Sequence, residues 1–116
     1  MVKIYFISLS LAMVPILGFA SNEDCKSAAK LLLNHGKFTE ATIQYTRCLD
    51  EYGDDGQSFY GIAVANFYQG LYDESLSYIS KAEQFGVNDA RHLRERIGEE
   101  QFQQEERLEK LNKVIH

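Results

Sequence analysis

Residues 36–41 read Gly36-Lys37-Phe38-Thr39-Glu40-Ala41, and residues 70–75 read Gly70-Leu71-Tyr72-Asp73-Glu74-Ser75. Both stretches give a glycine, any residue, an aromatic residue, a helix-capping residue, a glutamate and a small residue. The two glycines, at positions 36 and 70, lie 34 positions apart. Self-similarity at a period of this size is typical of repeat proteins, in which each repeat is one supersecondary unit. The pattern therefore predicts two copies of a helix–turn–helix unit.

Amphipathic helices are expected on both sides of each stretch, because apolar residues recur there at steps of three and four. Gly36 and Gly70 stand where a C-terminal cap belongs, and Thr39 and Asp73 are expected to cap the helices that follow. The expected helices are 24–34, 39–51, 57–69, 73–85 and 90–114. The last is mostly polar from residue 99 onward, either as an exposed extension or as a frayed tail. The predicted fold class is all-α.

The segment from Met1 to Ala20 has the features of a secretory signal peptide. Lys3 precedes an apolar run from Ile4 to Phe19, and the segment ends in Gly18-Phe19-Ala20. We expect cleavage after Ala20 and export to the periplasm or out of the cell. The alternative is a retained membrane anchor, although the run is close to the shortest length that can span a bilayer and is interrupted by Pro15. The predicted organisation is a signal peptide (1–20), two repeats (about 22–55 and 56–89) and a polar capping helix (90–116).

The chain that remains after cleavage is acidic. Removal of 20 of the 116 residues leaves 96 residues, and the loss of Lys3 leaves 11 Lys and Arg against 17 Asp and Glu. The formal net charge is then −6. Nucleic acids and anionic membranes attract proteins of the opposite sign. This charge therefore argues against both as general partners.

The two cysteines, Cys25 and Cys48, are expected to form a disulfide, because an exported chain meets oxidising conditions. Cys25 lies eleven residues before Gly36, and Cys48 lies eleven residues after Lys37. Two antiparallel helices that rise about 1.5 Å per residue from this turn bring both cysteines to the same height. The alternative is two buried free thiols. Two cysteines and three scattered histidines do not make a zinc site.

The period of 34 and the glycine-x-aromatic turn together resemble the tetratricopeptide repeat (TPR) family. Family positions in the second unit are occupied by Ala63, Gly70, Tyr72, Leu76 and Ala82. Those in the first unit are occupied by Ala29, Gly36, Phe38, Ala41, Tyr45 and Cys48. The resemblance implies an all-α, right-handed α-solenoid fragment that ends in a capping helix.

The chain departs from the family pattern at several positions. Gly53 and Val87 stand where a proline usually closes each unit, Ser75 replaces an alanine and Asn66 replaces a tyrosine. Two units are also fewer than the three or so that such stacks usually need for stability. This chain can compensate for the missing stability of a third unit in three ways: through the disulfide, through the fifth helix or through self-association.

The resemblance also implies a concave groove, lined by the first helix of each unit, that holds an extended peptide or a partner helix. The groove positions carried over by register are Lys26, Lys30, Leu33, Tyr60, Val64, Phe67, Tyr68, Arg91 and Arg94. Basic and aromatic residues in this pattern favour a peptide that is acidic or ends in a free carboxylate. The alternative is that these residues are ordinary solvated or packed helix surface. Gly61 and Glu95 replace residues of the family's specialised carboxylate clamp, which is therefore not expected.

The sequence contains no nucleophile elbow, no phosphate-binding loop and no distinctive carboxylate pair. We therefore expect a non-enzymatic scaffold or adaptor that needs no cofactor. One alternative is a structural subunit of an envelope complex that self-associates through its C-terminal helix. Another is a secreted effector or inhibitor that acts on a protein of another cell.

Overall fold

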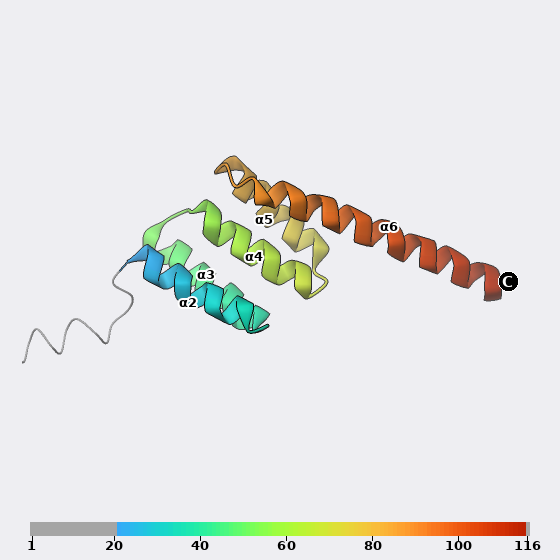
Figure 1. The fold of residues 1–116 in the computed structure, drawn as a ribbon, viewed down its shortest axis with the longest axis horizontal. Helices are drawn as coiled ribbons and strands as arrows, with labels where there is room; N and C mark the ends of the chain where they lie inside the picture. Colours follow the sequence, from blue (N-terminus) through green and yellow to red (C-terminus); the bar gives the residue numbers. More distant parts are fainter. Residues whose placement is uncertain (1–20, 116) are drawn as a thin grey trace, which may run out of the picture.

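The computed structural model describes residues 21–115, which form five α-helices joined by short turns (Figure 1). They are α2 (Asn22–Asn34), α3 (Phe38–Tyr52), α4 (Gly56–Tyr68), α5 (Tyr72–Gln84) and α6 (Asp89–Ile115). No strand occurs among these residues, so the predicted all-α class is confirmed. The predicted signal peptide lies outside the described residues. Within residues 21–115, no helix combines the length and the apolar character that crossing a bilayer requires.

The two sequence copies form the same turn. Gly36 and Gly70 both have a φ of 75°, a left-handed conformation that glycine adopts without steric cost. The amide of Lys37 donates to the carbonyl of Leu32, and at the equivalent place in the second copy the amide of Leu71 donates to the carbonyl of Asn66, both at 2.9 Å. This is the hydrogen-bond pattern that ends many helices at a glycine. The turn reverses the chain, so that α2 packs on α3 and α4 packs on α5.

The helix caps differ from the sequence expectation. Thr39 and Asp73 do not cap α3 and α5, because these helices begin one residue earlier, at Phe38 and Tyr72, and no side chain within residues 21–115 caps them. The hydroxyl of Thr39 instead donates to Gln69 of the next turn, at 3.4 Å. A polar residue near a helix start does not reveal which position it occupies: here the cap positions fall two residues earlier, at Lys37 and Leu71.

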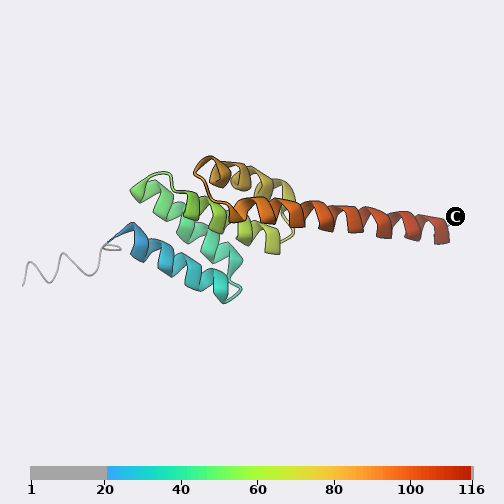
Figure 2. The same ribbon diagram turned by 45° about the horizontal axis from the view of Figure 1, so that its top comes forward.

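Helix α4 forms the centre of the fold and packs against each of the other four helices (Figures 1 and 2). Nine of its thirteen residues are buried. Phe59, Ala63 and Phe67 belong to the main core cluster with residues of α5 and α6, whereas Ile62 packs with Ala29 and Tyr45 of the first hairpin. Because both sides of α4 are covered, this one helix joins the two hairpins into a single body.

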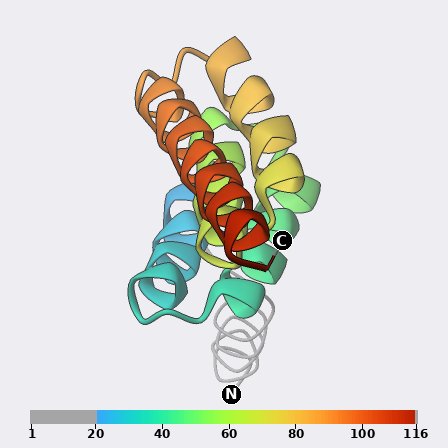
Figure 3. The ribbon, with the colours of Figure 1, turned by 90° about the vertical axis from the view of Figure 1, so that its right-hand side faces the viewer.

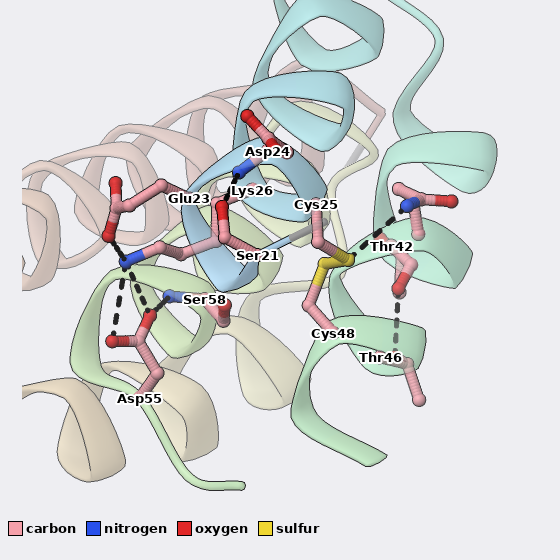
Figure 4. The surroundings of a disulfide bond; sticks show 11 residues. Ser21, Glu23, Asp24, Cys25, Lys26, Thr42, Thr46, Cys48, Asp55 and Ser58 are labelled. Atoms are coloured by element: carbon pink, nitrogen blue, oxygen red, sulfur yellow. Dashed lines mark hydrogen bonds and ion pairs between the residues drawn. A yellow bond between two sulfur atoms is a disulfide. The ribbon is translucent and has the colours of Figure 1, made fainter. Parts of the chain in front are cut away.

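The disulfide between Cys25 and Cys48 links α2 to α3, as predicted (Figure 4). Both cysteines are almost completely buried, and the side-chain amide of Gln44 donates to the sulfur of Cys25 at 3.4 Å. The cross-link closes a sequence separation of 23 residues. Cys25 and Ala29 are the buried residues of α2, so this helix has a small share of the core. The disulfide therefore adds a covalent link where packing contributes little.

Helix α6 has a packed half and an exposed half. Ala90, Leu93 and Ile97 are buried against α5 and α4. The helix then continues to Ile115, and residues 102–115 are all exposed. Figures 1 and 2 show this second half running past the ends of the other helices, and Figure 3 shows α6 obliquely, with its C-terminal end toward the viewer. The polar C-terminal stretch is thus an exposed helical extension.

Candidate functional site

An open groove of about 530 Å³ lies between the first helices of the two hairpins. Helix α2 supplies one wall, α4 supplies the other, Tyr45 of α3 lies at the floor and Asp89 lies at the start of α6. The lining residues are Glu23, Lys26, Ser27, Lys30, Leu33, Tyr45, Gln57, Tyr60, Gly61 and Asp89. Lys26, Lys30, Leu33 and Tyr60, four of the nine residues expected from the sequence, therefore line the same groove.

Lys26 connects the two walls of the groove. Its ammonium group lies 2.9 Å from Glu23 on the same helix and 3.3 Å from Asp55, and only 14% of its side chain is exposed (Figure 4). Asp55 also caps α4, because it accepts a hydrogen bond from the amide of Ser58 at 3.0 Å. Partial burial lowers the pKa of Lys26, but the hydrogen bonds and charges of Glu23 and Asp55 outweigh burial and raise it. The Lys26 charge is already paired within the protein.

Two charges in the groove are available to a ligand. Lys30 is exposed and makes no ion pair with any residue in the described part of the chain. Asp89 is also exposed and unpaired within residues 21–115, and it begins α6, where a helix favours negative charge. The groove therefore presents one free cation from α2 and one free anion from α6, a more balanced pattern than the basic groove expected from the sequence.

The floor of the groove depends on a close contact between Tyr45 and Gly61. A Cβ atom added at Gly61 would lie 2.3 Å from ring carbons of Tyr45, so only glycine leaves room for this ring. Tyr45 is 5% exposed, and burial raises the pKa of its hydroxyl to about 12. The missing side chain at position 61, which separates this chain from the carboxylate-clamp pattern, here allows α3 to reach the groove.

Tyr60 provides the aromatic surface of the α4 wall. It is half-buried and packs on the main core cluster. Burial raises the pKa of Tyr60, the negative charge of Asp89 and nearby Tyr68 add to the rise, and Arg96 lowers it. The ring therefore remains neutral under ordinary conditions and offers a rigid apolar face with a polar tip.

Three other expected aromatic and aliphatic groove residues do not line the groove. Phe67 is buried, and the guanidinium of Arg96 lies 4.8 Å above its ring. Tyr68 is stacked on Phe38 at the neighbouring turn, with ring centroids 5.3 Å apart. Val64 is half-buried against the core. These side chains hold the helices together at the end of α4 that is distant from Gln57.

The two arginines expected in the groove also lie elsewhere. Arg94 forms an ion pair with Glu83 and donates to the hydroxyl of Ser80 at 3.0 Å, so it joins α6 to α5. Arg91 is exposed and lies 3.9 Å from Glu95 on its own helix. The rotation of α6 about its axis decides this outcome, because its buried face turns the arginines away from α2.

Sequence reasoning missed several lining residues. Glu23 and Gln57 each lie three positions before an expected groove residue, so helical spacing alone indicates that they share a face with Lys26 and Tyr60. No spacing in the sequence indicates that Tyr45 lines the groove. It comes from the second helix of its hairpin and reaches the groove only because position 61 lacks a side chain.

Among residues 21–115, no group of three or more His, Cys, Asp or Glu side chains converges in a way that would hold a metal ion. When the chain is compared with models of protein families, with curated proteins and with solved structures, it matches none of them.

Proposed function

We propose that the protein is a non-enzymatic scaffold that, after export, holds a segment of another protein in the groove between α2 and α4. The open groove of about 530 Å³, lined by the first helices of both hairpins, is the observation that carries this proposal. We also propose a TPR-like arrangement, in which α2–α3 and α4–α5 are successive units of a right-handed stack and α6 caps the second unit. The recurrence of the same turn hydrogen bonds in both hairpins supports this arrangement.

The groove favours a ligand with a specific distribution of charge. Lys30 is the free cation, so we place a ligand carboxylate, from an acidic side chain or a chain terminus, beside α2. Leu33 and Tyr60 offer apolar surface next to it, and Asp89 offers a site for a basic group at the opposite wall. An extended peptide with one carboxylate, an apolar side chain and a basic residue matches this lining better than a uniformly acidic peptide.

A scaffold fits the chemistry of the lining better than an enzyme. General acid–base catalysis at neutral pH needs groups whose pKa lies near 7. The pKa values of Lys26, Tyr45 and Tyr60 are all raised, which moves these three groups further from that range. Among the described residues, neither a histidine nor a cysteine lines the groove. The groups that line the groove are therefore suited to binding a ligand and not to proton transfer near neutral pH.

Selection from a random peptide library on residues 21–116 in the oxidised form tests the proposal. We expect peptides that bind with micromolar affinity and share a carboxylate near an apolar residue. Lys30→Glu should weaken their binding about 10-fold or more, because a charged hydrogen bond contributes about 1.5–3 kcal/mol and the new charge repels the ligand. Tyr60→Ala should weaken it as well, through lost contact area.

Lys37→Glu is the matched control. It makes the same change of charge at an exposed turn position outside the groove, so the selected peptides should bind it as they bind the original chain. Failure to select any peptide would count against the proposal. Equal binding to the original chain and to Lys30→Glu with Tyr60→Ala would also refute it, because the ligands would then lie on another surface.

A further inference from the structure

A carboxylate already lies on the lysine side of the groove, and it belongs to the protein itself. The carboxylate of Glu23 lies 2.9 Å from the ammonium group of Lys26, and both residues line the groove (Figure 4). The side chain of Glu23 is 82% exposed, so little besides this ion pair fixes its position. The groove therefore accepts a carboxylate at Lys26, and Glu23 shows where that carboxylate lies.

The two carboxylates that pair with Lys26 are held unequally. Asp55 is fixed by the fold, because its side chain is only 24% exposed and also accepts a hydrogen bond from the amide of Ser58 as the cap of α4. The side chain of Glu23 forms no second ion pair within residues 21–115. Exposed ion pairs contribute little to stability, because water screens the charges and two long side chains lose freedom. Lys26 can therefore keep Asp55 and exchange Glu23 for an incoming carboxylate.

Lys30 provides a second positive charge beside Lys26. The two lysines are four residues apart on α2, so their Cβ atoms lie about 5–6 Å apart on one face of the helix, and both line the groove. A carboxylate has two oxygens and can accept hydrogen bonds from two ammonium groups. A ligand carboxylate between the lysines therefore contacts two cations, whereas Glu23 pairs with Lys26 alone.

We propose that Glu23 holds the place of the ligand carboxylate in the free protein, and that a bound peptide replaces Glu23 with its own carboxylate, which Lys26 and Lys30 then share. This inference rests on the proposed function, because it adds an internal competitor to the same groove. Glu23 is then a specificity-determining residue. A peptide without a carboxylate leaves Glu23 in place and gains no contact with Lys26, whereas a peptide with one exchanges a single ion pair for two.

Fluorescence anisotropy of a labelled peptide from the library selection, with residues 21–116 in the oxidised form, tests the exchange. Glu23→Gln should strengthen binding about 2- to 5-fold, because the peptide no longer displaces an exposed ion pair. The same peptide with its carboxylates replaced by carboxamides should bind the original chain and Glu23→Gln equally, since it does not compete with Glu23. Unchanged or weaker binding of the carboxylate peptide to Glu23→Gln would overturn the proposal.

Asp24 supplies a matched control for the loss of a negative charge. It follows Glu23 in the first turn of α2 and is exposed, but it does not line the groove. Asp24→Asn removes a charge of the same sign without removing a carboxylate from Lys26, so it should change the affinity by less than about 1.5-fold. Equal strengthening by Asp24→Asn and Glu23→Gln would contradict the proposal, because the gain would then follow net charge.

Lys26→Gln tests whether Glu23 acts through Lys26. This change should weaken binding of the carboxylate peptide, and in its background Glu23→Gln should have no further effect. The same 2- to 5-fold gain, within about a factor of 1.5, in both backgrounds would refute the exchange. Circular dichroism and urea unfolding of Lys26→Gln verify that α2 and α4 stay packed without the contact to Asp55.

The two levels of the argument fail differently. If no peptide is selected, the proposed function and the exchange are both wrong. If peptides are selected and lose affinity in Lys30→Glu, but bind Glu23→Gln and the original chain equally, the proposed function stands and only the exchange is wrong.

Discussion

Reduction of the Cys25–Cys48 disulfide should destabilise the protein by about 3.4 kcal/mol. The cross-link closes a separation of 23 residues, and the loop-entropy relation for that length gives this value at about 25 °C. Domains of this size are stable by only about 5–15 kcal/mol, so the loss is a large fraction of the total. The melting temperature should fall by roughly 14–27 °C, at about 4–8 °C per kcal/mol.

Thermal and urea unfolding, followed by circular dichroism with and without a phosphine reductant, measure this difference. Cys25→Ala with Cys48→Ala is the control, because its unfolding should not respond to the reductant. A free-thiol assay on the native oxidised protein should find no reactive cysteine. A stability difference below about 1 kcal/mol on reduction would refute the reasoning, because the packing of α2 would then suffice without the cross-link. Since α2 carries Lys26 and Lys30, the reduced protein should also bind selected peptides less tightly.

Two further predictions concern the floor of the groove. Gly61→Ala should destabilise the fold by about 1–3 kcal/mol in urea unfolding, because the added methyl group meets the Tyr45 ring. Gly98→Ala is the control, because this helix position has open space around it. Gly98→Ala should be neutral or stabilising by up to about 1 kcal/mol. In an ultraviolet absorbance titration one tyrosine should ionise near pH 12, and Tyr45→Phe should remove that step. In the unfolded chain tyrosine ionises near its ordinary pKa of 10.0, so the unfolded state loses its proton at a lower pH than the folded state. The contribution of neutral Tyr45 to the free energy of unfolding should therefore be complete below about pH 10 and disappear between pH 10 and 12.

The helical hairpins and the disulfide could be predicted from local sequence because their causes are local. A glycine with a positive φ ends a helix at the point where its apolar periodicity ends. The turn is short, so Cys25 and Cys48, which lie at equal numbers of residues from it, are placed opposite each other. The caps were predicted wrongly at Thr39 and Asp73. There the tight turn starts each helix one residue earlier, and no side chain of the described segment caps it.

The three expected groove residues of α2 line the groove, whereas the two expected arginines of α6 do not. Helix α2 has one buried face, marked by Cys25 and Ala29, so the position of Lys26 and Lys30 around the helix follows from the pattern. Helix α6 follows the second hairpin through a separate turn, and its rotation depends on how Leu93 and Ile97 pack on α5. That packing joins Arg94 to Glu83 and brings Asp89 into the groove instead.

The sequence by itself determined the elements of this protein: five helices, the turns at Gly36 and Gly70, the cysteine pair and the polar character of residues 99–115. The helices and turns follow from interactions between residues that are close in the chain, and the short turn at Gly36 then places the two cysteines at equal distances on either side of it. Only the tertiary structure decided which charges are free and which are paired. Lys26 pairs with Asp55, and Tyr45 fills the space left by Gly61. These contacts join residues 29 and 16 positions apart across helices whose relative rotation no local pattern specifies.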